Sequence, residues 1–302
     1  MEERKTIYLC LAHMSEAGLE QKYVKEAFDT NWVVPMGPNV NAFEKDLEAF
    51  ANSKSDGSEE LDRKVVCLSA GTAAVHLALI GCGVKAGDEV LVQSFTFCAS
   101  SHPITYLGAK PVFVGSEGET WNMDPVLLEK AILDRKEKTG KYPKAIVPVA
   151  LYGMPYDCDK IMAIADKYGI PVVEDAAEGC GSRWKGQVLG TFGKFGVLSF
   201  NGNKMITTSG GGALICQDAE SKNNVMWYAT QARDAYPYYQ HTAIGYNYRM
   251  SNVCAGIGRG QMTVLNDHIA HHKHVQKLYE ELLKSRMYTR SVLQQAMIRK
   301  ML

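Results

Sequence analysis

The chain has 302 residues, which is enough to bury a large core and suits one large domain with a smaller one or a helical extension. Its 33 basic residues balance its 33 acidic residues, so no net field favours nucleic acid. The start, Met1 to Lys5, has no apolar export segment, and no apolar run reaches the roughly 20 residues of a membrane helix. We therefore expect a cytoplasmic protein. The eight scattered cysteines form no Cys-x-x-Cys pair and are predicted to be reduced core residues.

Two helical patterns open the chain, at residues 16–30 and 39–52, and the Pro-containing segment between them cannot be helical throughout. From residue 65 onward, short β-rich runs alternate with helical ones. The strands are expected at 65–68, 89–92, 111–114, 145–149 and 171–174, and the helices at 72–82, 98–107, 124–138 and 159–168. Such alternation predicts right-handed crossovers and a mostly parallel sheet flanked by helices, an α/β fold.

Two further strands are expected at 195–199 and 212–216, and a helix that begins near Ser251 leads into a long helical stretch. We therefore predict a large α/β domain over residues 1–250, with the helical segment at its start. Residues 251–302 are predicted to form a long helix and the remnant of a smaller domain.

Four segments with polar or aromatic residues follow predicted strands: 69–72, 95–97, the residue Asp175, and 199–204. In open α/β sheets, ligands bind at the carboxyl ends of the strands. The sequence therefore predicts that these segments converge on one crevice.

Lys204 follows Asp175 by twenty-nine residues and lies between two predicted strands. A lysine amine can condense with the aldehyde of pyridoxal phosphate, and an aspartate at a strand end can keep the pyridine nitrogen of that cofactor protonated. The simpler interpretation is a surface lysine beside a Gly-rich hairpin and an aspartate that caps a helix. The residues around both positions favour the cofactor site.

The segment Ser69 to Ala74 joins a strand to a helix, so its free backbone N–H groups can hold a phosphate, as can Ser199 and Asn247. Such a turn also occurs for purely structural reasons. Phe97 is a candidate to stack on a flat cofactor, although it could equally be a core phenylalanine. Glu178, three residues after Asp175, is a candidate for the phenolic oxygen of the cofactor or an exposed cap residue.

His268 and His272 are spaced to share one face of a helix, where they could ligate a metal. No carboxylate or cysteine completes a site nearby, so we predict no metal centre.

Several motifs together resemble one known family, the pyridoxal-phosphate-dependent nucleotide-sugar aminotransferases of fold type I. The chain is most similar to those that aminate UDP-4-keto-6-deoxy-N-acetylglucosamine at C4. The motifs are Ser-Phe-Thr-Phe at 94–97, Glu-Asp-Ala-Ala-Glu at 174–178, Gly-Thr-Phe-Gly at 190–193, the segment 201–212, and Gly-Tyr-Asn-Tyr-Arg-Met-Ser-Asn at 245–252.

The resemblance implies a role for each matching residue. Lys204 would bind the cofactor covalently, Asp175 would pair with its pyridinium, and Phe97 would stack on its ring. The remaining cofactor contacts would be Gly71, Thr72, Ala73, Glu178 and Ser199, with Asn247 reaching the phosphate of the neighbouring subunit in a homodimer. Contacts to the nucleotide sugar would come from Asn31, Trp32, Val33, Val34 and Gly71.

The resemblance also implies a reaction, in which glutamate gives its amino group to a nucleotide-linked 4-keto-6-deoxy sugar for surface-glycan biosynthesis. From Arg286 onward the sequence departs from the family pattern, which has a small carboxyl-terminal domain, so we expect that domain to be truncated. A second hypothesis follows: a non-catalytic homologue or partner subunit that binds pyridoxal phosphate.

Overall fold

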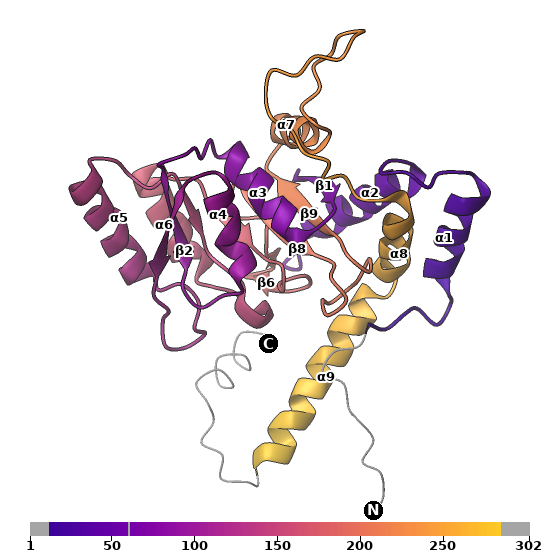
Figure 1. The fold of residues 1–302 in the computed structure, drawn as a ribbon. Helices are drawn as coiled ribbons and strands as arrows, with labels where there is room; N and C mark the ends of the chain where they lie inside the picture. Colours follow the sequence, from indigo (N-terminus) through magenta and orange to yellow (C-terminus); the bar gives the residue numbers. More distant parts are fainter. Residues whose placement is uncertain (1–11, 60, 285–302) are drawn as a thin grey trace, which may run out of the picture.

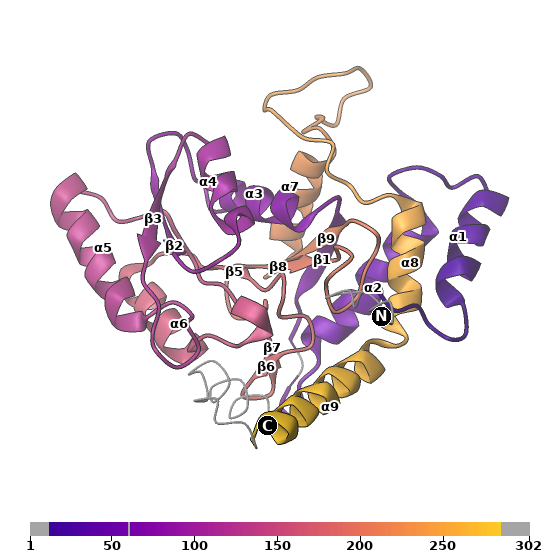
Figure 2. The ribbon, with the colours of Figure 1, turned by 60° about the horizontal axis from the view of Figure 1, so that its bottom comes forward.

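Mostly parallel strands form the centre of the fold in a computed structural model that describes residues 12–59 and 61–284. Figures 1 and 2 show helices on both faces of the sheet. The strands are β1 (Lys64–Leu68), β2 (Glu89–Gln93), β3 (Lys110–Val114), β4 (Ala145–Val147), β5 (Val173–Asp175), β6 (Arg183–Trp184), β7 (Gln187–Val188), β8 (Phe195–Ser199) and β9 (Gly212–Cys216). The predicted fold class is confirmed.

Bridges between the segments around β4 and β5 join a three-stranded sheet, β3-β2-β4, to a four-stranded sheet, β5-β8-β9-β1. Within this arrangement β9 runs antiparallel to both neighbours, β1 and β8, and the other pairings are parallel. The carboxyl ends of β1, β2, β4, β5 and β8 therefore lie along one edge, as predicted. The two-residue strands β6 and β7 form a separate hairpin, which was not predicted from the sequence.

The helices lie close to the predicted ranges, apart from one that is divided and one that was not expected. They are α1 (Leu19–Asp29), α2 (Pro38–Asn52), α3 (Gly71–Gly81), α4 (His102–Tyr106), α5 (Pro125–Thr139), α6 (Cys158–Tyr168), α7 (Ala219–Ala229), α8 (Asn252–Met262) and α9 (Leu265–Lys284). The helix expected over 98–107 is divided into a 3-10 turn, η1 (Cys98–Ser100), and α4, because Pro103 is accommodated in the first turn of a new helix and not in a helix interior. Helix α7 was not predicted.

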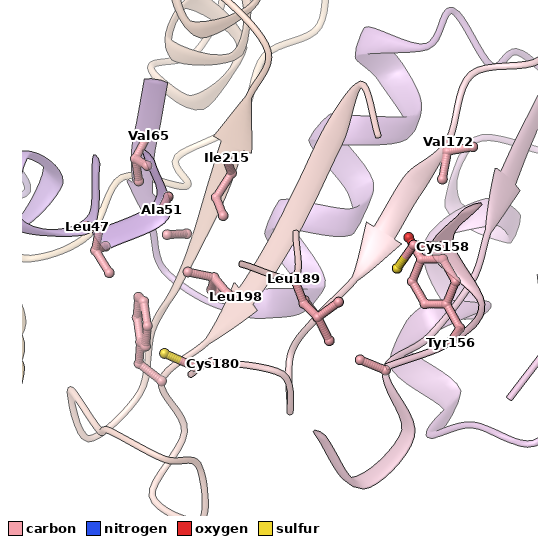
Figure 3. Close-up of a cluster of buried hydrophobic side chains, with 14 of the residues drawn as sticks. Leu47, Ala51, Val65, Tyr156, Cys158, Val172, Cys180, Leu189, Leu198 and Ile215 are labelled. Atoms are coloured by element: carbon pink, nitrogen blue, oxygen red, sulfur yellow. The ribbon is translucent and has the colours of Figure 1, made fainter. Parts of the chain in front are cut away.

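Side chains that alternate along the strands fill two hydrophobic cores, one on each face of the sheet. Val65 and Cys67 of β1 pack in the core that α2, α5 and α6 cover, whereas Val66 and Leu68 pack in the core under α3, α4 and α7. Figure 3 shows part of the first core, where Leu198 and Ile215 of neighbouring strands lie near Leu189. Because both faces of the sheet are buried, the sequences of its strands are nearly continuous apolar runs.

The cysteines that the structure describes are free, and most are buried, as predicted. Cys98 in η1 is exposed and Cys254 in α8 is partly exposed, so these two are exceptions. The predicted division at residue 250 stays a prediction, and the chain from Arg286 onward lies outside the described residues. No helix in the described part of the chain combines the length and the apolar character needed to cross a membrane.

Helix α8 packs against α1 and α2, so a segment late in the described chain contacts its first two helices. Asn252 fixes this contact. Its side-chain amide donates to the Trp32 carbonyl at 2.9 Å, and its Oδ1 atom accepts the Asn39 N–H at 2.9 Å. Gly37 is required here, because a Cβ on it would lie 2.7 Å from Asn252 Oδ1. Beyond α7 a long loop projects from the body (orange in Figure 1) before the chain returns to α8.

Candidate active site

A cavity of about 510 Å³ opens at the carboxyl edge of the sheet. The segments that follow β1, β2, β4, β5 and β8 all contribute to its walls. The predicted site residues that line it are Gly71, Thr72, Phe97, Asp175, Glu178, Ser199 and Lys204. The crevice predicted from the strand ends is therefore present, and it brings together most of the candidate residues.

Asp175, the last residue of β5, is buried and faces this cavity. Its Oδ2 atom accepts the hydroxyl of Ser100 at 2.5 Å, and its Oδ1 atom accepts the N–H of Ala177 at 3.2 Å. Burial raises the pKa of the Asp175 carboxyl, and the bond from Ser100 opposes that effect. A buried carboxylate of this kind is poised to pair with a cationic group in the cavity.

Glu174 lies next to Asp175 in β5 and points to the other side of the strand, as alternation in a strand requires. It accepts three backbone N–H groups: Gly190 at 3.0 Å, Phe192 at 2.6 Å and Gly193 at 2.7 Å. Burial raises the pKa of the Glu174 carboxyl, while these three bonds oppose the shift. Glu174 thus ties the Gly-Thr-Phe-Gly segment to the sheet and does not line the cavity.

Lys204 lies in the loop between β8 and β9, and its Nζ atom is 3.2 Å from Glu178 Oε1. Both side chains line the cavity and are shielded from solvent in part. The other oxygen of Glu178, Oε2, accepts the N–H of Tyr152 at 2.7 Å. The alternative interpretation of Lys204 as a surface lysine therefore fails, because the amine lies in the same cavity as Asp175 and beside a carboxylate.

The first turn of α3 faces the cavity with backbone N–H groups that no side chain caps. Such N–H groups and the helix dipole together favour a phosphate. Gly71 begins the helix in close contact with Ser199, and a Cβ on Gly71 would lie 3.1 Å from Ser199 Cβ. Gly71, Thr72 and Ser199 thus form a small pocket wall with the donors that a phosphate needs.

Phe97 is 75% exposed and lies on the cavity wall, so it is not a core residue. Phe95 also lines the cavity, and its ring packs against Trp121 with the ring centroids 5.4 Å apart. An exposed phenylalanine beside polar groups offers a face on which a flat ring can stack.

Other predicted residues lie outside the cavity walls in this chain. Ala73 is buried in α3 behind the first turn. Asn247 is exposed and forms a bridge with Thr230 at the base of the projecting loop. The segment Asn31 to Val34 is exposed near α8, where Asn252 holds its backbone. The structure does not bring these residues to Lys204 within one chain.

Two residues of the site were missed in the sequence. Ser100 lies three residues after Phe97, at the end of η1, and its contact with Asp175 joins residues 75 positions apart that no local pattern connects. Tyr152 follows β4, a strand whose carboxyl end also reaches the cavity edge. Its backbone is left-handed, with φ of 52°, which costs a non-glycine residue about 1 kcal/mol or more. Nothing in the sequence signals that conformation.

His268 and His272 lie on α9, where His268 Nδ1 is 3.2 Å from the Met205 carbonyl oxygen. Within residues 12–59 and 61–284, no group of three or more His, Cys, Asp or Glu side chains is arranged to hold a metal ion.

The chemistry of the cavity residues fits pyridoxal phosphate. A buried carboxylate, a lysine amine, an uncapped helix start and an exposed aromatic ring are the four partners that the pyridine nitrogen, aldehyde, phosphate and ring of this cofactor need. They meet in one cavity at the carboxyl edge of an α/β sheet. Fold and site together define an enzyme that depends on pyridoxal phosphate.

Comparison with known proteins places the chain more narrowly. It belongs to the DegT/DnrJ/EryC1/StrS aminotransferase family, whose sequence model matches residues 15–299. EpsN of Bacillus subtilis (strain 168) is 46% identical over 279 residues, which are 92% of this chain and 69% of that protein. GDP-perosamine synthase of Escherichia coli O157:H7 is 36% identical over 278 residues, covering 92% of this chain and 72% of that enzyme.

A solved structure gives the same result. The chain superposes with a TM-score of 0.81 on Spr1654 from Streptococcus pneumoniae in its PLP form, at 26% identity and with 93% of this chain and 72% of that chain covered. The protein is therefore a sugar aminotransferase that uses pyridoxal phosphate, as the resemblance implied. The narrower similarity to UDP-4-keto-6-deoxy-N-acetylglucosamine 4-aminotransferases stays a prediction.

Proposed function

We propose that the chain transfers the amino group of glutamate to the C4 carbonyl of a nucleotide-linked 4-keto-6-deoxy sugar. The observation that carries this proposal is the placement of Lys204 Nζ in the same cavity as the buried Asp175 carboxylate. The name of one relative, GDP-perosamine synthase, supports a nucleotide-linked amino sugar as the product class. A UDP-linked N-acetylated sugar is the acceptor that the motif at 201–209 favours.

Each cavity residue has a task in this reaction. When bound, pyridoxal phosphate supplies an aldehyde that takes up the amino group and a ring that accepts electrons. Lys204 Nζ moves the proton to and from the reacting substrate carbon, as a general base and acid. Asp175 holds a proton on the pyridine nitrogen, and Ser100 keeps the Asp175 carboxylate oriented toward it. Gly71, Thr72, Ala73 and Ser199 would hold the phosphate.

Glu178 lies between two donors, the Lys204 amine and the Tyr152 N–H, so its carboxylate is held at the cavity wall. This carboxylate keeps the Lys204 ammonium in place before the cofactor enters. If the cofactor engaged the Lys204 amine, Glu178 would still be fixed by the Tyr152 N–H and would be a candidate partner for the phenolic oxygen. We infer that the side chain serves as a cofactor contact in the loaded enzyme.

Purified protein loaded with pyridoxal phosphate and glutamate should aminate one member of a panel of UDP- and GDP-linked 4-keto-6-deoxy sugars, detected by mass. Lys204→Ala should lower turnover by at least about 10²- to 10⁴-fold, because it removes the group that moves the proton. It should also lose the absorption band of the loaded parent protein. Lys194→Ala, at a lysine outside the cavity, is the matched control.

The parent chain would be the non-catalytic homologue if it bound the cofactor and left that band unchanged with every amino donor. If glutamate changed the absorption band but no sugar in the panel was aminated, the assignment of glutamate as amino donor would stand and the assignment of the sugar acceptor would be wrong. A Lys204→Ala variant with the absorption band and the turnover rate of the parent would contradict the role assigned to Lys204.

We further propose that two chains share their active sites, with Asn247 of one chain reaching the phosphate site of the other. Asn247 is exposed at the base of a projecting loop and does not line the cavity of its own chain, which supports this arrangement. In this proposal the loop is part of a homodimer interface. The nucleotide sugar would then also meet the exposed segment Asn31 to Val34.

Mixing Lys204→Ala and Asn247→Ala chains tests the shared site. If the lysine and the asparagine of one site come from different chains, a mixed dimer contains one intact site and one doubly damaged site. Activity should then reappear on mixing. Confirmed mixed dimers without recovered activity would contradict the arrangement.

A further inference from the structure

The turn that carries Tyr152 is strained and firmly held. Tyr152 lies in the 3-10 turn η2 (Leu151–Gly153) with φ of 52° and ψ of 29°, a left-handed conformation that side chains other than glycine rarely adopt. Strain of this kind persists only where the surroundings fix the backbone, and it is concentrated at functional sites. The strained backbone at Tyr152 therefore indicates a function for this residue.

Hydrogen bonds hold the turn from both sides. Asn122 accepts the N–H of Leu151 at 3.1 Å and donates to the carbonyl of Met154 at 3.0 Å. On the other side, Glu178 accepts the N–H of Tyr152 at 2.7 Å, and the Ser182 hydroxyl donates to the Gly153 carbonyl at 2.6 Å. These bonds use backbone atoms of the turn, so none of them needs the side chain of Tyr152.

The Tyr152 ring adds little to the core. It is 60% exposed, it lines the cavity, and it belongs to neither of the two hydrophobic cores. Glycine at this position would keep every backbone bond of the turn and would remove the strain. Because the turn itself needs no tyrosine and the ring lines the cavity, the aromatic side chain is available to contact a ligand there.

Among the described residues that line the cavity, Lys204 is the only cationic side chain. An amino donor with two carboxylates is recognised mainly by cations, so an uncharged ring is poorly suited to it. The hydrophobic C–H face of a sugar packs well on an aromatic ring, and the phenol hydroxyl can bond to a sugar hydroxyl. Phe95 and Phe97 supply further aromatic surface on the cavity wall.

We propose that Tyr152 is a specificity-determining residue that contacts the sugar ring of the nucleotide-linked acceptor. The inference rests on the proposed function, and it adds that the Tyr152 side chain serves recognition of the sugar and not of the amino donor. The backbone of the same residue holds Glu178, and through it Lys204, whereas the side chain serves the acceptor.

The test compares the two half-reactions of Tyr152→Gly, Tyr152→Asn and Tyr152→Phe in the loaded enzyme. Glycine and asparagine both tolerate the left-handed backbone, so the fold should survive, with a melting temperature at or above that of the parent for glycine. The acceptor kcat/KM should fall about 10- to 100-fold in both variants, because the contact with the sugar is lost. The rate of conversion by glutamate should stay within about twofold.

A second measurement does not depend on turnover. UDP-N-acetylglucosamine serves as the probe, and calorimetry should show binding to the pyridoxamine form of the parent that weakens to a similar degree in Tyr152→Gly. Tyr152→Phe distinguishes the ring from the hydroxyl. Full activity in Tyr152→Phe assigns the contact to the ring, and a loss equal to that of glycine assigns it to the hydroxyl, so either result supports a substrate contact.

The control is Lys185→Gly, which relieves a left-handed backbone with φ of 47° in the β6–β7 hairpin, outside the cavity. It should leave both half-reactions unchanged. Acceptor kcat/KM within twofold of the parent in Tyr152→Gly would overturn the inference, as would an equal loss of both half-reactions in the glycine and asparagine variants. A parent enzyme that aminates no sugar in the panel would instead overturn the proposed function, and this inference with it.

Discussion

Two neighbouring carboxyl groups, Glu174 and Asp175, have opposite roles because they point to opposite sides of β5. Glu174 accepts three backbone N–H groups from the segment 190–193 and is sealed inside the protein. Asp175 accepts one hydroxyl and one N–H and faces the cavity. Burial raises the pKa of both groups, so a shifted pKa alone does not identify the residue of the active site.

What separates them is the number of donors that the protein itself supplies. The oxygens of Glu174 are used within the fold, whereas the Asp175 carboxylate borders a space large enough for a ligand. The comparison predicts that changes at Glu174 act on folding and that changes at Asp175 act on chemistry.

The largest expected effect is that of Asp175→Asn on turnover. An amide cannot hold a proton on the pyridine nitrogen as a carboxylate does, so kcat should fall by about 10²- to 10⁴-fold. The fold should remain intact, because asparagine keeps the size of the side chain and its acceptor for Ser100. Steady-state kinetics and circular dichroism check this. A variant that unfolded instead would break the comparison, since it would make Asp175 a structural residue.

Glu174→Ala should lower the free energy of unfolding by about 3 kcal/mol, because it leaves three buried N–H groups without an acceptor. Urea denaturation measures the effect. Glu129→Ala, which removes a carboxylate bonded to Lys167 and Tyr168 near the surface, should change the stability by less than about 1 kcal/mol. Loss of turnover in a fully stable Glu174→Ala protein would contradict the structural role.

Ser100→Ala removes the side-chain donor to Asp175 and should lower kcat/KM about tenfold, the value of one hydrogen bond to a charged group. Ser101→Ala is the matched control, because the Ser101 hydroxyl is exposed and bonds only to the Cys98 carbonyl within η1 and its cap. Equal activity of the two variants would show that the hydrogen bond from Ser100 to Asp175 does not contribute to catalysis.

The smallest effect concerns pH and the stability of the protein without cofactor. The folded pKa of Asp175 is raised by burial, so this group stabilises the fold most below its unfolded pKa of about 3.9, and that contribution is lost as pH rises through the folded value. Asparagine does not ionise, so the Asp175→Asn variant does not lose stability in this way as pH rises. The stability of the variant relative to the parent should therefore grow as pH rises from 4 to 7, measured by urea denaturation. An unchanged difference would show that burial does not disfavour the Asp175 charge.

The strand ends illustrate what the sequence could predict. Short apolar runs separated by helical patterns predicted the sheet, and the rule that ligands lie at the carboxyl ends then predicted a crevice with Lys204 and Asp175 in it. The hairpin of β6 and β7 escaped prediction because two-residue strands have no periodicity. Tyr152 escaped because its left-handed backbone is imposed by Asn122, Glu178 and Ser182, which are distant in the chain.

The loop at Asn31 to Val34 shows that long-range contacts could not be predicted from the sequence. The loop resembles a family segment that contacts the nucleotide sugar, and its non-helical character was predicted. Its position, however, depends on a hydrogen bond from the Asn252 side chain to the Trp32 carbonyl, 220 residues away. No local pattern reports such a contact. The same is true of Ser100 and Asp175, which are 75 residues apart and joined by one hydroxyl.

The contacts of α8 with α1 and α2 have a consequence for synthesis in the cell. Asn39, near the start of α2, bonds to a residue made 213 positions later. At about 5 to 20 residues per second, the ribosome takes roughly 10 to 40 s to produce that partner. During this time α1 has left the exit tunnel but α8, the helix it packs against, has not been made. The apolar side of α1 is therefore exposed and accessible to chaperones.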